Sequence, residues 1–349
     1  MKYRVLGKTG VVVSELCFGT MTFGGVGYFA TMGNTGQEDA DKLIKLALDH
    51  GINFFDTANA YSNGESEKIT GQAFRNLGIN RHDIFLSTKV FLRMGPGINN
   101  AGTSRLHIHR SVDESLKRLG HDHIDLLYIH SMDKYTPIEE TLRGLDEVVR
   151  AGKVRYIGAS NVPAWQIMKA LSYSEKYGWA RFEALQYYYS LLGRDIEYEI
   201  LPLCIDQQIS VIPWSPLAGG FLSGKYRRSK ESQGDGSRRD SFDFPPIKNK
   251  EKAYDVIEEL DRIAQNRPGA TVAQIALAWL LRQPQVVSTI FGSKKLEQLA
   301  DNTKASEIEL TDEEVETLNK LTEPEPIYPH YMIQRQNKWR DGDFKISKH

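Results

Sequence analysis

The sequence predicts an α/β protein that folds as a (β/α)8 TIM barrel. Eight strand-like runs occur along the chain, helix-like stretches lie between them, and the runs end on polar or glycine residues. The runs read SELCFG, INFFDT, DIFLSTK, IDLLYIH, VRYIGASN, RFEALQ, ISVIPW and VVSTIFG. A strand followed by a helix, repeated to the end of the chain, is typical of this barrel.

The remaining elements follow from local signals taken in chain order. A small hairpin is expected over residues 3–13, with its turn at Lys8-Thr9-Gly10, before the first barrel strand. Glycines 51, 78, 120 and 152 stand where four of the helices should stop. Residues 311–321 begin with a capping-box pattern and predict a helix outside the eight repeats. The helices expected after the strands are 38–50, 65–77, 104–119, 138–151, 163–177, 196–207, 272–281 and 296–302.

Four stretches are expected to be long and irregular: 20–37, 91–103, 226–246 and 324–349. The first three follow the first, third and seventh strands, so they should shape a pocket at the carboxyl ends of the strands. The segment SKESQGDGSRRDS within the third also has the composition of a disordered linker. We expect a single domain over 1–349, with the barrel at about 14–302, the extra helix at 311–321 and a C-terminal tail at 324–349.

Composition narrows the class of protein. The formal net charge of -1 argues against a nucleic-acid partner, which needs an excess of basic residues. The only two cysteines, Cys17 and Cys204, lie in apolar runs and provide neither a disulfide framework nor a metal site. The longest apolar stretch, VAQIALAWLL, is too short to cross a bilayer, and Glu15 interrupts the one apolar run near the N-terminus. A cytoplasmic protein is therefore expected, without a membrane partner.

Four polar side chains near the strand ends suggest proton transfer. Asp56, Lys89 and His130 end the second, third and fourth strands, and Tyr61 follows Asp56 by five residues. An ammonium near Tyr61 would favour its phenolate, Asp56 would keep Lys89 charged, and a neutral His130 would orient a carbonyl. Taken singly, each of the three strand-end residues has an ordinary structural explanation, such as a cap or a solvated strand end. Their occurrence together in strand order favours a catalytic site.

Three other motifs are discounted. GGFLSGKY resembles a P-loop, but Tyr226 replaces the residue that would hold magnesium. Glycines 24, 25 and 27 do not satisfy the dinucleotide-binding pattern G-x-G-x-x-G. The pairs at 107/109 and 121/123 are interpreted as solvated histidines, because residues two apart on a helix do not share a face.

Successive motifs of the chain resemble those of the aldo-keto reductases. They read DTANAYSNGESE, LSTKV, LLYIH, GASN, LQYYYSLL, IPWSPLAGGFLSGKY and GSKKLEQLADN. The resemblance runs from YRVLGKTG to about Leu321, and the opening segment with WSPLAGGFLSGKY is most similar to the branch of aryl-alcohol dehydrogenase-like reductases and potassium-channel β-subunits. It implies that Asp56, Tyr61, Lys89 and His130 form the catalytic tetrad, with Tyr61 as the proton donor.

The resemblance also implies a nicotinamide cofactor, NADP(H) and possibly also NAD(H). It places Ser160, Asn161 and Gln186 at the nicotinamide carboxamide and Trp214 against the nicotinamide ring. It places Ser215, Leu217, Gly219 and Lys225 at the pyrophosphate, and Gly292, Ser293, Lys294, Gln298 and Asn302 at the adenosine 2′-phosphate and adenine. Gly19, Thr20, Met21 and Pro216 complete the implied cofactor site. Gln298 replaces the family's phosphate-holding arginine, which lowers the expected discrimination against NADH.

The function expected on these grounds is NADP(H)-dependent reduction of a small aldehyde or ketone, or oxidation of the alcohol. Two alternatives stay open: a cofactor-binding regulatory subunit of the channel β-subunit type, and a hydrolase or lyase that uses Lys89 as a Schiff base. Tyr28, Phe29 and Phe91 are candidates for substrate binding. Together with Tyr328, Tyr331 and Trp339 they either line an aromatic pocket or anchor the long loops. The particular substrate, the direction of reaction and the oligomeric state do not follow from the sequence.

Overall fold

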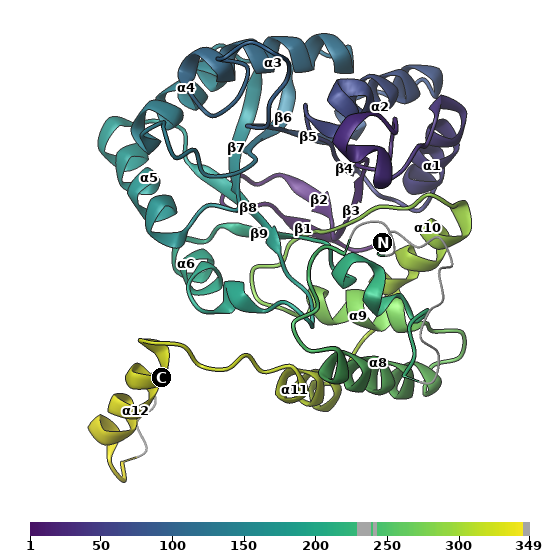
Figure 1. The fold of residues 1–349 in the computed structure, drawn as a ribbon, viewed down its shortest axis with the longest axis vertical. Coiled ribbons are helices and arrows are strands. Elements are labelled where there is room, and N and C mark those ends of the chain that lie inside the picture. Colours follow the sequence, from purple (N-terminus) through teal and green to yellow (C-terminus); the bar gives the residue numbers. More distant parts are fainter. Residues whose placement is uncertain (229–238, 240–242, 345–349) are drawn as a thin grey trace.

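The computed structural model describes residues 1–228, 239 and 243–344, and its centre is a sheet of eight parallel strands. The strands follow one another in the order β10-β3-β4-β5-β6-β7-β8-β9. A parallel bridge between Val211 and Val286 joins the two ends of this order, so the sheet closes into the predicted (β/α)8 barrel. Figure 1 shows the helices as an outer ring around the strands. The strands are β3 (Leu16–Gly19), β4 (Phe54–Asp56), β5 (Phe85–Val90), β6 (Ile124–Ile129), β7 (Val154–Ser160), β8 (Phe182–Tyr188), β9 (Ser210–Trp214) and β10 (Thr289–Phe291).

The predicted hairpin is present and closes the amino-terminal end of the barrel. Strands β1 (Tyr3–Val5) and β2 (Val12–Ser14) pair antiparallel. Leu6 and Val13 are fully buried and pack with Phe54 and Leu126, which lie near the starts of β4 and β6. Because the hairpin covers this end, ligands reach the barrel interior from the carboxyl ends of the strands.

Side chains alternate between the two faces of the barrel wall, as the period of two requires. On β5, Phe85 belongs to the cluster inside the barrel, whereas Leu86 belongs to the larger core between strands and helices. The same alternation separates Phe54 from Phe55 on β4. Continuing the alternation past these apolar residues brings Asp56, Lys89 and His130 to the inner face at the carboxyl end.

The helices mostly confirm the predicted positions. They are α1 (Gln37–Asp49), α2 (Glu65–Asn76), α3 (Arg105–Leu119), α4 (Ile138–Arg150), α5 (Ala164–Tyr177), α6 (Ile200–Gln207), α8 (Lys250–Gln265), α9 (Val272–Leu281), α10 (Leu296–Thr303), α11 (Asp312–Leu321) and α12 (His330–Asp341). Shorter 3-10 turns are η1 (Gly27–Thr31), η2 (Tyr61–Gly64), η3 (Arg81–Asp83), η4 (Asp195–Glu197), η5 (Ala218–Ser223) and η6 (Lys304–Glu307). The capping box predicted for α11 is formed by Thr311 and Glu314.

Three features differ from the sequence prediction. The helix expected over 196–207 is divided into η4 and α6, which places Pro202 in the first turn of α6, where no N–H is needed. Helix α8 was not predicted, although its buried residues Ala253, Val256, Ile257, Leu260, Ile263 and Ala264 follow helical spacing. The tail was expected to be irregular, but it contains α12. Most of the linker-like SKESQGDGSRRDS segment lies outside the described residues.

The interpretation of the histidines as solvated was wrong for His107, which is buried on α3 against Ser111. His109 reaches Glu147 on α4 at 2.9 Å and so joins α3 to α4, whereas Ser111, the partner of His107, lies on α3 itself. Among the helices that the structure describes, none has the length and apolar character needed to span a bilayer.

Candidate active site

Lys89 lies at the centre of the polar group predicted from the strand ends. It is fully buried on β5, and its Nζ donates to a carboxylate oxygen of Asp56, to the Thr57 carbonyl at 2.8 Å and to the Tyr61 hydroxyl at 3.3 Å. These three acceptors use all three N–H groups of an ammonium. Burial lowers the pKa of Lys89, but Asp56 and Tyr61 outweigh it and raise that pKa overall. Lys89 is therefore a fixed cation.

Asp56 is held by three neighbours. Its Oδ2 accepts from Lys89, while its Oδ1 accepts from the Ser87 hydroxyl at 2.6 Å and from the Gln186 amide at 3.1 Å. A buried carboxylate needs such donors to remain ionised. Sequence reasoning did not single out Ser87. The alternation along β5 could have identified Ser87, because positions 85, 87 and 89 face the same side of the strand.

Tyr61 begins the turn η2 and faces His130. Their ring centroids are 5.8 Å apart in an edge-on arrangement. Ser62 and Asn63, which follow Tyr61, both have left-handed backbone angles, with φ of 49° and 55°. Ser62 also donates to the Phe23 carbonyl and accepts from the Gly25 N–H, each at 3.0 Å, so it fixes the loop after β3 beside Tyr61. This role of Ser62 was not foreseen.

His130 is a neutral imidazole at neutral pH. Burial, with a further contribution from the Lys89 ammonium, lowers the pKa of His130 to about 3. Its Nδ1 is buried without a hydrogen-bond partner among the described residues. A neutral imidazole keeps one N–H donor, and nothing described within the barrel competes for it.

The six aromatic residues considered for a substrate pocket fall into two groups, one at the barrel rim and one in or beside α12. The ring of Phe29, in η1, lies 5.1 Å from the Tyr61 ring, and Tyr28 packs edge-on against Phe29 at 5.3 Å. Phe91 follows β5 directly and is half-buried on the same rim. Tyr331 and Trp339 belong to α12, with Tyr328 just before it, and Figure 1 shows α12 clear of the barrel. These three residues do not line the barrel mouth.

The residues implied for the nicotinamide lie on neighbouring strand ends. Ser160 ends β7 and faces Gln186 of β8 in register. Asn161, with φ of 55°, donates to the His130 carbonyl at 3.1 Å and accepts from the Trp214 indole N–H at 3.3 Å. Trp214 ends β9 and is half-buried between Tyr188, at 5.3 Å, and Phe244, whose ring is nearly parallel at 5.8 Å.

The turn after β9 is compact. The Ser215 hydroxyl accepts from the Gly219 N–H at 2.9 Å, and the N–H groups of Ala218 and Gly220 bond to carbonyls of the same turn. A Cβ on Gly219, which has φ of 66°, would come within 2.6 Å of the Phe244 carbonyl. Pro216 is buried beneath the turn, Leu217 is half-buried and Lys225 is exposed. Ser215 and Lys225, two of the residues implied for the pyrophosphate, thus lie in this turn and directly after it.

The ends of β10 and β3 adjoin each other. Ser293 accepts from the Thr22 hydroxyl through its carbonyl at 3.4 Å, and a Cβ on Gly292 would meet the Gly19 carbonyl at 3.3 Å. The Thr20 hydroxyl is bonded to Ser66, and Met21 is half-buried beside it. The Ser293 hydroxyl is engaged with Lys295 in its own turn. Lys294 and Gln298 are exposed, while Asn302 is buried one helical turn beyond Gln298 on α10.

The structure thus brings Asp56, Tyr61, Lys89 and His130 together at the carboxyl end of a (β/α)8 barrel, with the Lys89 ammonium beside the Tyr61 hydroxyl. The model of the Aldo/keto reductase family matches residues 15–323. The chain belongs to this family of oxidoreductases, which generally use nicotinamide cofactors.

Individual relatives agree with the family and with the predicted branch. The chain is 38% identical over 330 residues to the uncharacterized oxidoreductase YrpG of Bacillus subtilis, and this alignment covers 92% of this chain and 96% of the relative. It is 38% identical over 312 residues to a probable voltage-gated potassium channel subunit beta of Arabidopsis thaliana, with coverages of 88% and 92%. A Schizosaccharomyces pombe protein named as a putative aryl-alcohol dehydrogenase is 33% identical over 357 residues, with coverages of 93% and 97%.

Proposed function

We propose that the protein is an NADP(H)-dependent reductase of small aldehydes or ketones, working in either direction, with Tyr61 as the proton donor. The observation that carries this proposal is the position of the Lys89 ammonium, which is anchored on Asp56 and donates to the Tyr61 hydroxyl at 3.3 Å. A cation at this position favours loss of the Tyr61 proton to a bound carbonyl oxygen.

The roles of the chain's residues follow from charge and position. As Tyr61 gives up its proton, the adjacent ammonium stabilises the phenolate that forms. Asp56, with Ser87 and Gln186 behind it, keeps Lys89 charged and in place. The neutral His130 supplies an N–H that would orient the carbonyl oxygen toward Tyr61. The hydride would come from a nicotinamide held beside these residues.

Cofactor binding is assigned to the rim of strands β7–β10. We propose that Ser160, Asn161 and Gln186 hold the carboxamide and that Trp214 covers one face of the ring. Ser215 and Lys225 would bind the pyrophosphate, and Lys294 would favour the 2′-phosphate of NADP(H) through a charge-assisted contact. Position 298 is a glutamine and adds no positive charge beside the 2′-phosphate, so we propose that NAD(H) can also be used.

The same geometry argues against Lys89 as a Schiff-base residue. Such a lysine needs a neutral, accessible amine. Lys89 is fully buried, all its N–H groups are used, and its pKa is raised. Its cationic role beside Tyr61 is better supported.

The test is NADPH oxidation by the purified protein with a panel of aldehydes, ketones and sugars. Tyr61→Phe should lower turnover by roughly 10²–10⁴ and leave the quenching of tryptophan fluorescence by NADPH unchanged. The matched control is Tyr177→Phe, a half-exposed tyrosine on α5 that lies outside the site. Wild-type turnover in Tyr61→Phe would remove this residue from the mechanism.

A second candidate role is that of a cofactor-binding regulatory subunit, and its support is the 38% identity to a protein named as a potassium channel subunit beta. The two roles share the cofactor site but differ in turnover. If NADPH quenches the fluorescence and no carbonyl compound of the panel is reduced, the regulatory role is favoured. Turnover that depends on Tyr61 favours the enzyme.

A further inference from the structure

The C-terminal arm, defined as residues 327–344, leaves the barrel instead of packing on it. Figure 1 shows α12 standing apart from the helical ring, and no residue of α12 is buried. The arm is held only at its base by the described residues, where the Tyr198 hydroxyl donates to the Glu325 carbonyl and the Tyr198 ring lies 5.3 Å from the His330 ring. Prolines 324, 326 and 329 restrict the backbone between this base and α12.

A helix of this kind needs a partner. An isolated helix of 12 residues is marginal in water, and most helical stability in proteins comes from packing one face. Apart from the ring contact of His330 with Tyr198, the described part of the barrel buries no residue of α12, so a partner surface for this helix lies outside this copy's barrel.

One face of the arm has the composition of a protein interface. Tyr331, Arg335 and Trp339 recur every four residues along α12 and share one face of the helix, and Tyr328 lies beside Tyr331 just before the helix. These four residues are called the aromatic stripe. The Arg335 guanidinium lies 4.6 Å over the Trp339 ring, and the two tyrosine rings are 6.0 Å apart. Trp339 is 66% exposed and Tyr328 is 72% exposed. Tyrosine, arginine and tryptophan are the residues that most often dominate binding energy in interfaces.

Charge indicates which partner fits the stripe. Arg335 and Lys338 form no ion pair within the described part of the chain. Residues 311–326, the acidic base, carry six acidic residues and a single lysine, and Glu323 and Glu325 form no ion pair with any described residue. Within the described residues, no ion pair joins α12 to the acidic base of its own copy. In a dimer with twofold symmetry, the arm of each copy can contact the acidic base of the other copy. The same pairing of basic with acidic side chains then occurs at two places in the dimer.

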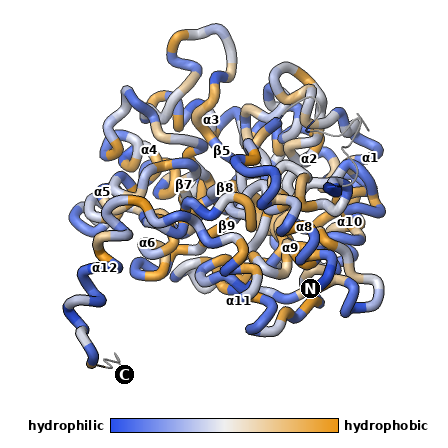
Figure 2. Tube along the Cα trace, turned by 60° about the horizontal axis from the view of Figure 1, so that its bottom comes forward, coloured by the Kyte–Doolittle hydropathy of each residue, from blue (hydrophilic) through white to orange (hydrophobic). Residues whose placement is uncertain are grey.

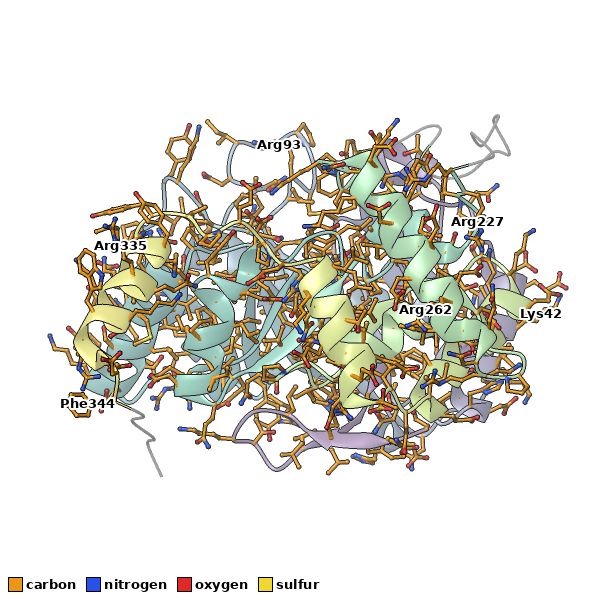
Figure 3. The ribbon with its side chains drawn as sticks, turned by 90° about the horizontal axis from the view of Figure 1, so that it is seen from below. Lys42, Arg93, Arg227, Arg262, Arg335 and Phe344 are labelled. Atoms are coloured by element: carbon orange, nitrogen blue, oxygen red, sulfur yellow. The ribbon has the colours of Figure 1, made fainter. Side chains whose placement is uncertain are left out.

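We propose that the arm is an interaction segment that packs its aromatic stripe against a second copy of this chain, with Arg335 and Lys338 facing the partner's acidic base. Figure 3 shows Arg335 and Phe344 at the outer edge of the molecule, where a second copy has access to them. Figure 2 shows α12 as a largely hydrophilic helix, which suits a charged protein surface better than the interior of a lipid bilayer.

The test is sedimentation velocity of the full chain over a wide dilution series. The wild type should dimerise, and Trp339→Ala should weaken the dimer by at least about 30-fold, the effect of losing one central interface residue. The matched control is Trp165→Ala, because Trp165 on α5 is 62% exposed, close to the value for Trp339. This control should dimerise like the wild type. Thermal unfolding of both variants should match the wild type, since neither side chain supports the core.

Charge reversal identifies the partner surface. Arg335→Glu with Lys338→Glu should dissociate the dimer, and the further changes Glu323→Lys and Glu325→Lys should restore it. A wild type that stays monomeric at every concentration overturns the proposal, as does a dimer that Trp339→Ala leaves intact. Failure of the second pair of changes to restore the dimer overturns the pairing with the acidic base. Binding of a monomeric wild type to anionic phosphatidylserine vesicles, lost in Trp339→Ala, would assign the arm to membranes instead.

Discussion

Replacing Lys89 by methionine tests the central ion pair, because it keeps the length of the side chain and removes the ammonium. The change deletes three hydrogen bonds, to Asp56, Thr57 and Tyr61, in a site where Lys89 and Asp56 are both buried. Ser87 and Gln186 still donate to Asp56, but no cation balances its charge. Breaking a buried pair in this way costs about 3–5 kcal/mol of folding free energy. A domain of ordinary stability survives this loss and can still be assayed.

A second variant separates stability from catalysis. Lys89→Met combined with Asp56→Asn removes both charges, so the free energy of unfolding should recover to within about 1–2 kcal/mol of the wild type. Turnover should not recover, because the ammonium beside Tyr61 is still missing. Residual activity in either variant should have its pH profile moved toward alkaline values, since the phenolate is no longer stabilised.

Urea unfolding followed by circular dichroism gives the stabilities, and NADPH oxidation gives the turnover. If the double variant is as unstable as the single one, the uncompensated Asp56 charge is not the source of the loss. If Lys89→Met keeps wild-type turnover with an unshifted pH profile, Lys89 has no part in proton transfer. Asp56→Asn alone should also be destabilising, which completes the cycle.

Three further outcomes are expected. Trp214→Ala should weaken NADPH binding by about 1–2 kcal/mol and abolish most of the fluorescence quench, whereas Trp165→Ala should not; a retained quench contradicts the stacking role. Lys294→Ala should reduce the preference for NADPH over NADH in direct binding measurements, and equal affinities in the wild type would refute that preference. Burial and the Lys89 ammonium lower the pKa of His130 to about 3, so below pH 6.5 the unfolded chain binds a proton that the folded chain does not. Folding stability should therefore decrease as the pH is lowered. The loss due to His130 at pH 5 is about 2 kcal/mol. His130→Gln should lose less stability than the wild type between pH 7 and pH 5, and an identical loss would contradict the assignment.

Much of the fold and the candidate site could be predicted from sequence because both depend on local periodicity. Eight strand-like runs, each with side chains alternating in and out, place the last inward residue of each strand at one end of the barrel. Asp56, Lys89 and His130 are such residues, so strand order alone placed them side by side. The hairpin and α11 were predictable for the same reason, since a turn and a capping box are formed by neighbouring residues.

Local pattern was less informative where an element depends on its surroundings. Helix α8 has an amphipathic spacing, although no helix was predicted there, whereas α12 has no buried face to give such a spacing. The division between η4 and α6 reflects a proline that fits a helix only in its first turn.

The amino-acid sequence specifies which residues lie at the strand ends, whereas the atoms that meet there depend on the folded barrel. Gln186 reaches Asp56 across 130 residues of chain, and Ser87 binds the same carboxylate from the neighbouring strand. Such contacts depend on barrel closure and on strand register, which bring distant segments within hydrogen-bonding distance. A period of two along a strand records the face on which a side chain lies, but it carries no information about the partner that another strand will place opposite it.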